Sequence, residues 1–169
     1  MSTDKEQFAF SKENLKKAQK IVAKYPDGRQ KSAMLPLLDI AQRQNGGWLS
    51  VPAIEYVANY ISEPYMRAYE VASFYTMYNL KPVGKYHIQV CGTTPCWLRG
   101  AGEIMETCEK LTKAKCGETS EDGMFTISEV ECLGACVNAP IVQINDDYYE
   151  DLDSKKMGDL IKEFKTKKA

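Results

Sequence analysis

The 169-residue sequence contains few of the residues on which several common chemistries depend. Its one histidine, His87, excludes a Rieske iron–sulfur centre, which needs two histidine ligands. It has no C-x-x-C pair of the thioredoxin dithiol type. It also has no glycine-rich loop of the kind that binds dinucleotides or phosphates. No apolar run approaches the roughly 20 residues that a membrane-spanning helix needs.

Net charge is also small, at −1, but it is unevenly distributed. Residues 1–83 hold 11 Lys and Arg against 8 Asp and Glu, whereas residues 84–169 hold 11 against 15 and contain all six cysteines. The N-terminus has neither an apolar signal core nor an Arg-rich presequence, so we expect a cytosolic protein. Thiols stay reduced in the cytosol, and this cysteine cluster therefore indicates a metal site rather than a disulfide framework.

The first half of the sequence has the apolar spacing of helices. Ser11 and Ser50 are predicted N-caps, with Phe10 and Leu15 forming a hydrophobic staple around the first. Two further helices are predicted over 32–45 and from Ser62 through Phe74. We expect the aromatic side chains of the last of these and of the residues after it to lie mainly in the core of a helical bundle, with a partner surface as the alternative for part of them: Tyr69, Phe74, Tyr75 and Tyr78.

Two helices joined by a tight turn also suggest a helix-turn-helix DNA reader. Residues 50–80 contain one basic residue, Arg67, against Glu55, Glu63 and Glu70. Binding to the phosphates of DNA requires several Lys or Arg side chains. We therefore predict no nucleic-acid partner.

Lys81 to Gly84 interrupts the helical pattern, and we place a domain boundary there, giving domains 1–83 and 84–169. After it, strands are predicted over 86–91, 125–130, 141–144 and 148–152. One helix is predicted with Thr94 as its cap, Pro95 as its first residue and a core stripe that continues through Cys108, and a last one after the N-cap Asp153. The predicted fold class is α/β, with a helical bundle followed by a βαβ–ββα domain.

Four cysteines form the array C-x4-C, 35 residues, C-x3-C, with Cys91 and Cys96 in the first pair and Cys132 and Cys136 in the second. Each pair follows a predicted strand, and 35 residues suit a βαβ connection. Parallel strands end at the same edge of a sheet, so we expect the two pairs to meet there. Four thiolates suit either structural zinc or a [2Fe–2S] cluster, and the spacing alone favours the cluster without excluding zinc.

The other cysteines are predicted not to be ligands, with Cys108 in the helix core and Cys116 a free thiol in a polar loop. We expect apolar neighbours of the array to limit water access to a bound group: Trp97, Leu133, Ala135 and Val137. Glu129 and Glu131 precede a candidate ligand, and their negative charge is expected to lower the reduction potential of a bound cluster.

Three blocks of sequence carry a resemblance to a known family. They are RAYEVASFYTMY at 67–78, HIQVCGTTPCWLRG at 87–100 and ECLGACVNAP at 131–140. Together they resemble the thioredoxin-like [2Fe–2S] subunits of respiratory complex I, the small partners of the FMN-carrying subunit. The resemblance covers nearly the whole chain, and it favours iron–sulfur over zinc.

The resemblance implies one [2Fe–2S] cluster held by Cys91, Cys96, Cys132 and Cys136. It implies a thioredoxin-like second domain, with Ala139–Pro140 as the place for a cis peptide. It also implies an electron-transfer subunit of an NADH:quinone oxidoreductase, with FMN and NADH on a partner subunit. The expected location is the bacterial cytoplasm, with contact to the inner membrane only through the complex. Related subunits also serve NAD-linked hydrogenases and formate dehydrogenases, and the sequence leaves those open.

Overall fold

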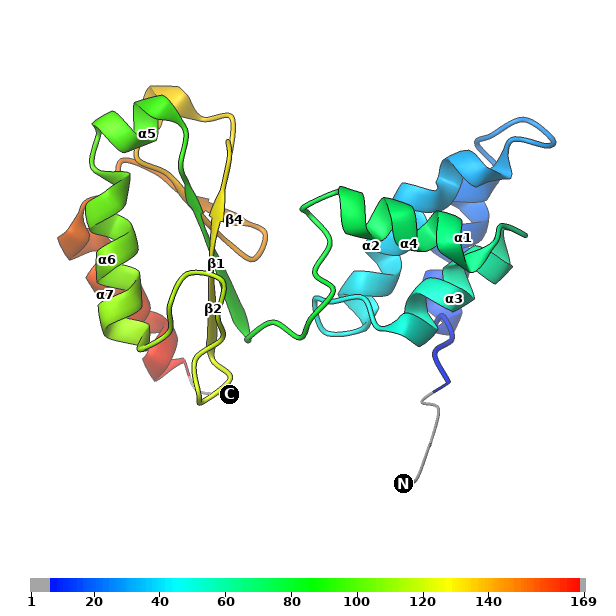
Figure 1. The fold of residues 1–169 in the computed structure, drawn as a ribbon, viewed down its shortest axis with the longest axis horizontal. Coiled ribbons are helices and arrows are strands. Elements are labelled where there is room, and N and C mark those ends of the chain that lie inside the picture. Colours follow the sequence, from blue (N-terminus) through cyan, green and yellow to red (C-terminus); the bar gives the residue numbers. More distant parts are fainter. Residues whose placement is uncertain (1–6, 168–169) are drawn as a thin grey trace. The chain divides into compact units, whose positions relative to one another are not determined.

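The structure is a computed structural model that describes residues 7–167. Contacts divide the chain into two compact units, residues 1–82 and residues 83–169, called here the helical unit and the sheet unit (Figure 1). No helix among the described residues is both long and apolar enough to cross a membrane.

The helical unit consists of four α-helices and one 3-10 turn among its described residues: α1 (Lys12–Val22), η1 (Gln30–Ala33), α2 (Met34–Gln44), α3 (Val51–Tyr60) and α4 (Tyr65–Phe74). The predicted caps are confirmed, because the side chain of Ser11 accepts a hydrogen bond from Asn14 N and that of Ser50 from Ala53 N. Of the predicted staple around Ser11, Phe10 is buried in the apolar core of this unit and Leu15 packs against that core. Helix α2 begins two residues after the predicted Ser32, preceded by the 3-10 turn.

Helix α4 begins three residues after the predicted start at Ser62. Ser62 has a φ of 57° and therefore lies in the left-handed region, which a right-handed helix cannot include. Pro64 then occupies the N-cap position with an extended backbone. The prediction of a helix through Phe74 is confirmed, but its predicted first turn is wrong because a strained turn residue precedes the helix.

The sheet unit follows the predicted order of elements. They are β1 (Tyr86–Cys91), α5 (Thr94–Leu98), α6 (Ala101–Thr112), β2 (Phe125–Val130), η2 (Cys136–Asn138), β3 (Val142–Ile144), β4 (Asp147–Tyr149) and α7 (Ser154–Thr166). The strand order in the sheet is β2-β1-β3-β4. Strands β1 and β2 are parallel, in a register that pairs Tyr86 with Phe125 and Cys91 with Val130. Strands β3 and β4 continue the sheet in antiparallel orientation.

Helices α6 and α7 pack against each other and lie beside the sheet (Figure 1). Their buried side chains join those of the central strands in one apolar core, with Ile88, Ile104, Ile127, Met157 and Ile161 among its largest members. Burying each such side chain contributes about 1.5–3 kcal/mol. This core supports the sheet edge at which the cysteine loops lie.

The helix predicted to run from Thr94 through Cys108 is in fact two helices. Gly100 lies between them with a φ of 96°, a conformation that glycine adopts at little cost. The break leaves Leu98 70% exposed, although the single-helix prediction placed it in the core stripe. Strand β4 ends at Tyr149 rather than at residue 152, and β3 begins one residue late. The peptide bond Ala139–Pro140 is cis, as predicted.

Candidate metal centre

The two cysteine pairs follow the two parallel strands at one edge of the sheet. Cys91 is the last residue of β1, and Cys132 lies two residues beyond Val130, the last residue of β2. The register aligns these strand ends directly, since Cys91 pairs with Val130. Figure 1 shows α5 and the short turn η2, which carry Cys96 and Cys136, at the same end of the sheet. The predicted placement of both pairs at one sheet edge is confirmed.

The first pair is buried. Cys91 is 1% exposed and Cys96 0%. Burial raises the pKa of the Cys96 thiol, the nearby Cys91 and Cys136 raise it further, and a hydrogen bond from the backbone of Ile141 opposes them. Three of the four thiols therefore interact electrostatically, and a cation among them would stabilise the thiolate forms.

The second pair is exposed on the loop between β2 and β3. The Gly134 amide donates a hydrogen bond to Cys132 Sγ at 3.3 Å, and Gly134 has a φ of 76°, which suits glycine. Among residues 7–167, no group of three or more His, Cys, Asp or Glu side chains is arranged closely enough to hold a metal ion.

The donor set fits a group that takes four thiolates. All four cysteines are free thiols, and soft thiolate ligands suit zinc and iron–sulfur clusters. His87 lies within β1, where its Nε2 shares a 2.8 Å hydrogen bond with Ser128 Oγ. Burial lowers the pKa of His87, which favours its neutral form. This histidine is a strand residue, as predicted.

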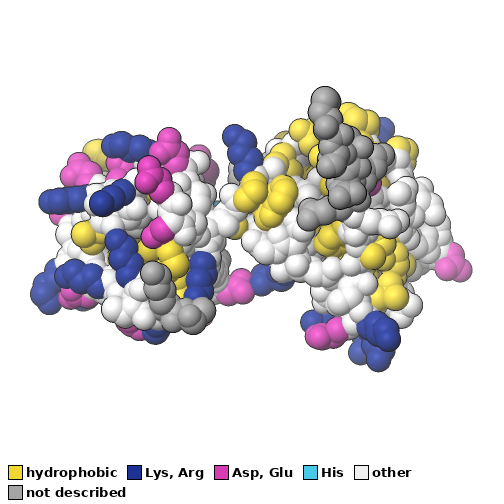
Figure 2. Space-filling model, turned by 90° about the horizontal axis from the view of Figure 1, so that it is seen from below, with side chains coloured by type: hydrophobic (Ala, Val, Ile, Leu, Met, Phe, Trp, Pro, Cys, Tyr) yellow, Lys and Arg dark blue, Asp and Glu magenta, His cyan; other side chains and the backbone are white. Residues whose placement is uncertain are grey.

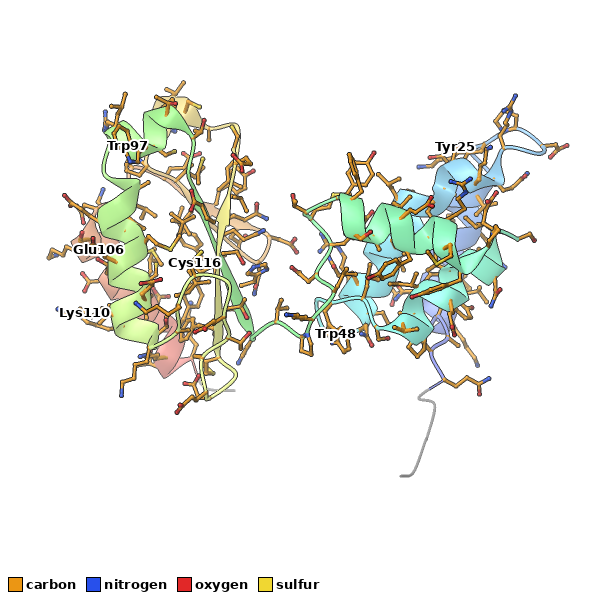
Figure 3. All side chains as sticks on the ribbon, viewed as in Figure 1. Tyr25, Trp48, Trp97, Glu106, Lys110 and Cys116 are labelled. Atoms are coloured by element: carbon orange, nitrogen blue, oxygen red, sulfur yellow. The ribbon has the colours of Figure 1, made fainter. Side chains whose placement is uncertain are left out.

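Cys108 and Cys116 lie where the sequence placed them. Cys108 is fully buried in α6, and burial raises the pKa of its thiol to about 12. Cys116 is exposed in the loop between α6 and β2, and its backbone N–H donates to Glu109 Oε1 at 2.9 Å. Figure 3 shows Cys116 well separated from Trp97, the neighbour of Cys96 on α5.

The prediction that four apolar neighbours of the cysteines limit water access is only half right. Leu133 and Ala135 pack against the core of the sheet unit. In contrast, Trp97 is 68% exposed and Val137 95% exposed, so neither covers the cysteines by burial. Both follow a cysteine by one residue, and the short helical turn at each position directs them outward while Cys96 turns inward.

The aromatic residues at the end of the helical unit are mostly at its surface, contrary to prediction. Tyr78 is 6% exposed, and its hydroxyl donates to the Leu35 carbonyl at 2.8 Å. Phe74, however, is 76% exposed, and Tyr69 and Tyr75 are also exposed. Helix α4 fully buries only its small residues Ala68 and Ala72. Tyr65 and Val71 pack partly against the core, and the other large side chains of the helix are exposed. Figure 2 shows hydrophobic side chains gathered in several places on the helical unit.

Three contacts at the site have no signal in the sequence. The side chain of Glu129 occupies the space beside Gly92 in the first cysteine loop. The second cysteine loop receives a hydrogen bond from Tyr148 on β4, and its Asn138 donates one to Glu150 just after that strand. Only the sheet register and the hairpin bring these residues to the loops.

Comparison with known proteins supports the same assignment. The sequence profile of the family described as thioredoxin-like [2Fe–2S] ferredoxin matches residues 18–165. A subunit of the NADH-quinone oxidoreductase of Rickettsia conorii is 67% identical over 161 residues, which cover 95% of this chain and 96% of that protein. The mitochondrial NADH dehydrogenase [ubiquinone] flavoprotein 2 of Dictyostelium discoideum is 55% identical over 161 residues, which cover 95% of this chain and 65% of that protein.

Among solved structures, an NAD+-reducing [NiFe]-hydrogenase in the H2-reduced state is similar, with a TM-score of 0.68 and 21% identity. The match covers 79% of this chain and 23% of the hydrogenase chain, and it supports the fold alone. The profile match and the long, highly identical alignments establish the family. The chain belongs to the thioredoxin-like [2Fe–2S] ferredoxins, within the family of NADH-quinone oxidoreductase subunits that includes the Rickettsia protein.

Proposed function

We propose that this chain is the electron-transfer subunit of an NADH:quinone oxidoreductase. In this proposal it holds one [2Fe–2S] cluster that exchanges single electrons with the FMN of a partner subunit. The observation that carries it is the arrival of both cysteine pairs at one edge of the parallel β1–β2 pair. A redox-inactive zinc staple uses the same donors, so the identity of the metal is the first thing to test.

Cys91, Cys96, Cys132 and Cys136 are the proposed ligands. When bound, a [2Fe–2S] cluster supplies a one-electron couple. The chain's own residues provide two different environments for it. The buried first pair holds its side of the site away from water, whereas the second pair leaves the other side open at the surface. An open side lets a partner approach a bound group closely.

The partner is proposed to be the subunit that carries FMN and oxidises NADH. The chain has no glycine-rich dinucleotide loop of its own, and relatives of near-equal length are named as one subunit of a larger oxidoreductase. In this proposal the cluster lies in domain 84–169, and domain 1–83 supplies partner contacts. The exposed apolar residues near the end of the helical unit support the second assignment: Met66, Phe74, Tyr75 and Met77. The proposed location is the bacterial cytoplasm, on the cytoplasmic side of the inner membrane through the complex.

One observation favours a second candidate, the corresponding subunit of an NAD-linked hydrogenase. The hydrogenase match extends over 79% of this chain, which is more than either unit alone. At 21% identity it supports a shared fold, whereas identities of 67% and 55% connect the chain to quinone-linked enzymes. We therefore place the quinone-linked function first.

The test is anaerobic reconstitution of the chain with iron and sulfide. Two irons and two acid-labile sulfides per chain are expected, with an EPR signal that appears on reduction. Replacing any one of the four ligands by Ser should greatly reduce the iron content, whereas Cys116→Ser should not. Stoichiometric zinc in the purified chain with no EPR signal after reconstitution would reject the proposal.

A separate experiment tests the partner. The chain is co-expressed with candidate FMN-carrying subunits from quinone-linked and hydrogenase-linked enzymes. Co-purification of flavin with the quinone-linked subunit is expected. Exclusive binding to the hydrogenase-linked subunit would favour the second candidate.

A further inference from the structure

The second cysteine loop lies outside the regular strands and helices of the sheet unit. Between β2 and β3, the chain has only the three-residue turn η2, and Cys132 and Cys136 are both exposed. Leu133 and Ala135 of this loop pack against the core, but the two cysteines are not themselves held by burial. Surface loops are usually more mobile than the elements they connect, so hydrogen bonds to this loop matter for the position of the pair.

Strand β4 and the two residues after it make hydrogen bonds to the loop at two points, one just after Cys132 and one just after Cys136. The Tyr148 hydroxyl donates to the carbonyl of Leu133, the residue after Cys132, at 3.0 Å. Beyond Cys136, Asn138 Nδ2 donates to Glu150 Oε2 at 2.6 Å. The backbone N–H of Asp151 donates to the Asn138 carbonyl at 2.8 Å. Each cysteine thus lies close in sequence to a tethered residue, Cys132 directly before Leu133 and Cys136 two residues before Asn138.

The strand that makes these hydrogen bonds to the loop is connected by strand pairing to the centre of the sheet. Tyr148 pairs with Gln143 of β3, and Gln143 pairs with Gln89 of β1, the strand that ends at Cys91. The first cysteine pair and the residues that hold the second cysteine loop are therefore connected through the same hydrogen-bonded sheet. A charged acceptor such as a carboxylate makes a stronger hydrogen bond than a neutral one, which favours the contact from Asn138 to Glu150.

We propose that Tyr148 and Glu150 are positioning residues for Cys132 and Cys136. By holding the loop next to each cysteine, they fix where the exposed pair lies relative to the strands that carry the buried pair. This inference rests on the proposed function, because it takes Cys132 and Cys136 as ligands. It gives the edge strand β4 and the residue after it, which carry no cysteine, a role in positioning the exposed cysteine pair.

The test uses the full-length chain, reconstituted with iron and sulfide. Tyr148→Phe removes only the donor hydroxyl, and Glu150→Ala removes the acceptor, whereas Glu150→Gln keeps an acceptor oxygen. Tyr149→Phe is the matched control, because this neighbouring ring packs against Phe164 instead of the loop. The readouts are the EPR g-values of the reduced cluster and the rate of iron release to a chelator.

Tyr148→Phe and Glu150→Ala are expected to load a full cluster, shift the g-values and release iron faster. A rise of about three- to tenfold in the release rate corresponds to loss of one ordinary hydrogen bond. The g-values and the iron-release rate of Glu150→Gln should be close to those of wild type. Those of Tyr149→Phe should equal the wild-type values.

Wild-type spectra and release rates in Tyr148→Phe and Glu150→Ala would overturn the positioning role while leaving the proposed function intact. A lower unfolding midpoint of the cluster-free chain, with unchanged spectra in the loaded fraction, would also overturn it, because that result describes a purely structural role. Failure of the wild-type chain to bind iron and sulfide would overturn both proposals.

Discussion

Glu129 fills the space beside Gly92 that any larger residue at position 92 would need. A Cβ built on Gly92 would lie 3.1 Å from Glu129 Cδ and 3.2 Å from Cγ, and closer still to one carboxylate oxygen. The parallel register brings the two together, because Glu129 pairs with Val90 and the Gly92 amide donates to the Val130 carbonyl at 2.8 Å. A negative charge therefore lies against the loop that joins Cys91 to Cys96.

Glu129→Gln is expected to raise the reduction potential of the bound cluster. Reduction adds negative charge, and a nearby carboxylate opposes it. Glu129 is exposed, so its contribution should stay below about 1 kcal/mol. For a one-electron couple this corresponds to less than about 40 mV. Redox titration followed by EPR measures the shift.

Glu131→Gln is the matched control for this charge. Glu131 is also exposed and lies beside Cys132 in the sequence, but it has no comparable contact with the first loop among the described residues. The reduction potential should rise more in Glu129→Gln than in Glu131→Gln. A potential that falls, or equal shifts in the two variants, would contradict the role assigned to the contact with Gly92.

Tyr78 offers a test of what stabilises the helical unit. Its hydroxyl donates to the Leu35 carbonyl from a nearly fully buried position. Tyr78→Phe should lower the free energy of unfolding of this unit by about 1 kcal/mol. In a Trp97→Phe background, the fluorescence of Trp48 reports the helical unit alone, because these are the only two tryptophans and they lie in different units (Figure 3).

The same residue predicts a pH dependence. Burial raises the pKa of Tyr78 above its ordinary value of 10.0, so the unfolded chain loses this proton first as pH rises. The stabilisation is therefore fully present below pH 10.0 and is lost above it, by up to about 1.4 kcal/mol per pH unit. Above that pH, the difference in free energy of unfolding between wild type and Tyr78→Phe should become smaller. If this difference in free energy of unfolding grew with pH, it would show that Tyr78 is not held in its neutral form.

Thiol alkylation at pH 8 separates the cysteine environments. In the cluster-free chain, Cys116 should react readily and Cys108 should not, because Cys108 is fully buried and its thiol pKa is raised to about 12. In the cluster-loaded chain, Cys132 and Cys136 should become protected while Cys116 still reacts. Peptide mass spectrometry measures each site. Continued labelling of Cys132 in a fully loaded chain would remove it from the ligand set.

Much of the fold follows from local signals in the sequence. Ser11 and Ser50 cap helices because their side chains accept from backbone amides three residues on. The alternation around Ile88 and the 35-residue spacing of the cysteine pairs together predicted the parallel strands and their shared edge. These features depend on residues close in sequence or on general rules of βαβ connection.

The errors arose where tertiary context overrides a local pattern. Leu98 fits a helical stripe, but Gly100 breaks the helix and turns Leu98 outward. Phe74 fits the core by its chemistry, yet α4 packs through small residues. The contacts of Tyr148 and Glu150 with the second cysteine loop depend on how a hairpin folds back across the sheet edge, which no spacing encodes.

The exposed apolar residues of the helical unit give a prediction about its proposed contact with the partner subunit. Phe74 and Met77 are 76% and 53% exposed, and aromatic side chains dominate the binding energy of many interfaces. Hydrogen bonds from Gln42 to the Met77 carbonyl and from Asn79 to the Gly47 carbonyl fix this segment at the surface. Phe74→Ser should weaken binding to the FMN-carrying subunit by about tenfold or more, with an unfolding midpoint close to wild type.

Val51→Ser is the control for that measurement. Val51 is similarly exposed, at 54%, but lies in the first turn of α3, outside the segment that contains Phe74 and Met77. Its substitution should leave the affinity for the flavin-carrying subunit unchanged in a titration monitored by calorimetry. Equal losses in both variants would point to a general effect on the helical unit. No loss in Phe74→Ser would show that the partner binds elsewhere, with the open side of the cysteine site as the next surface to test.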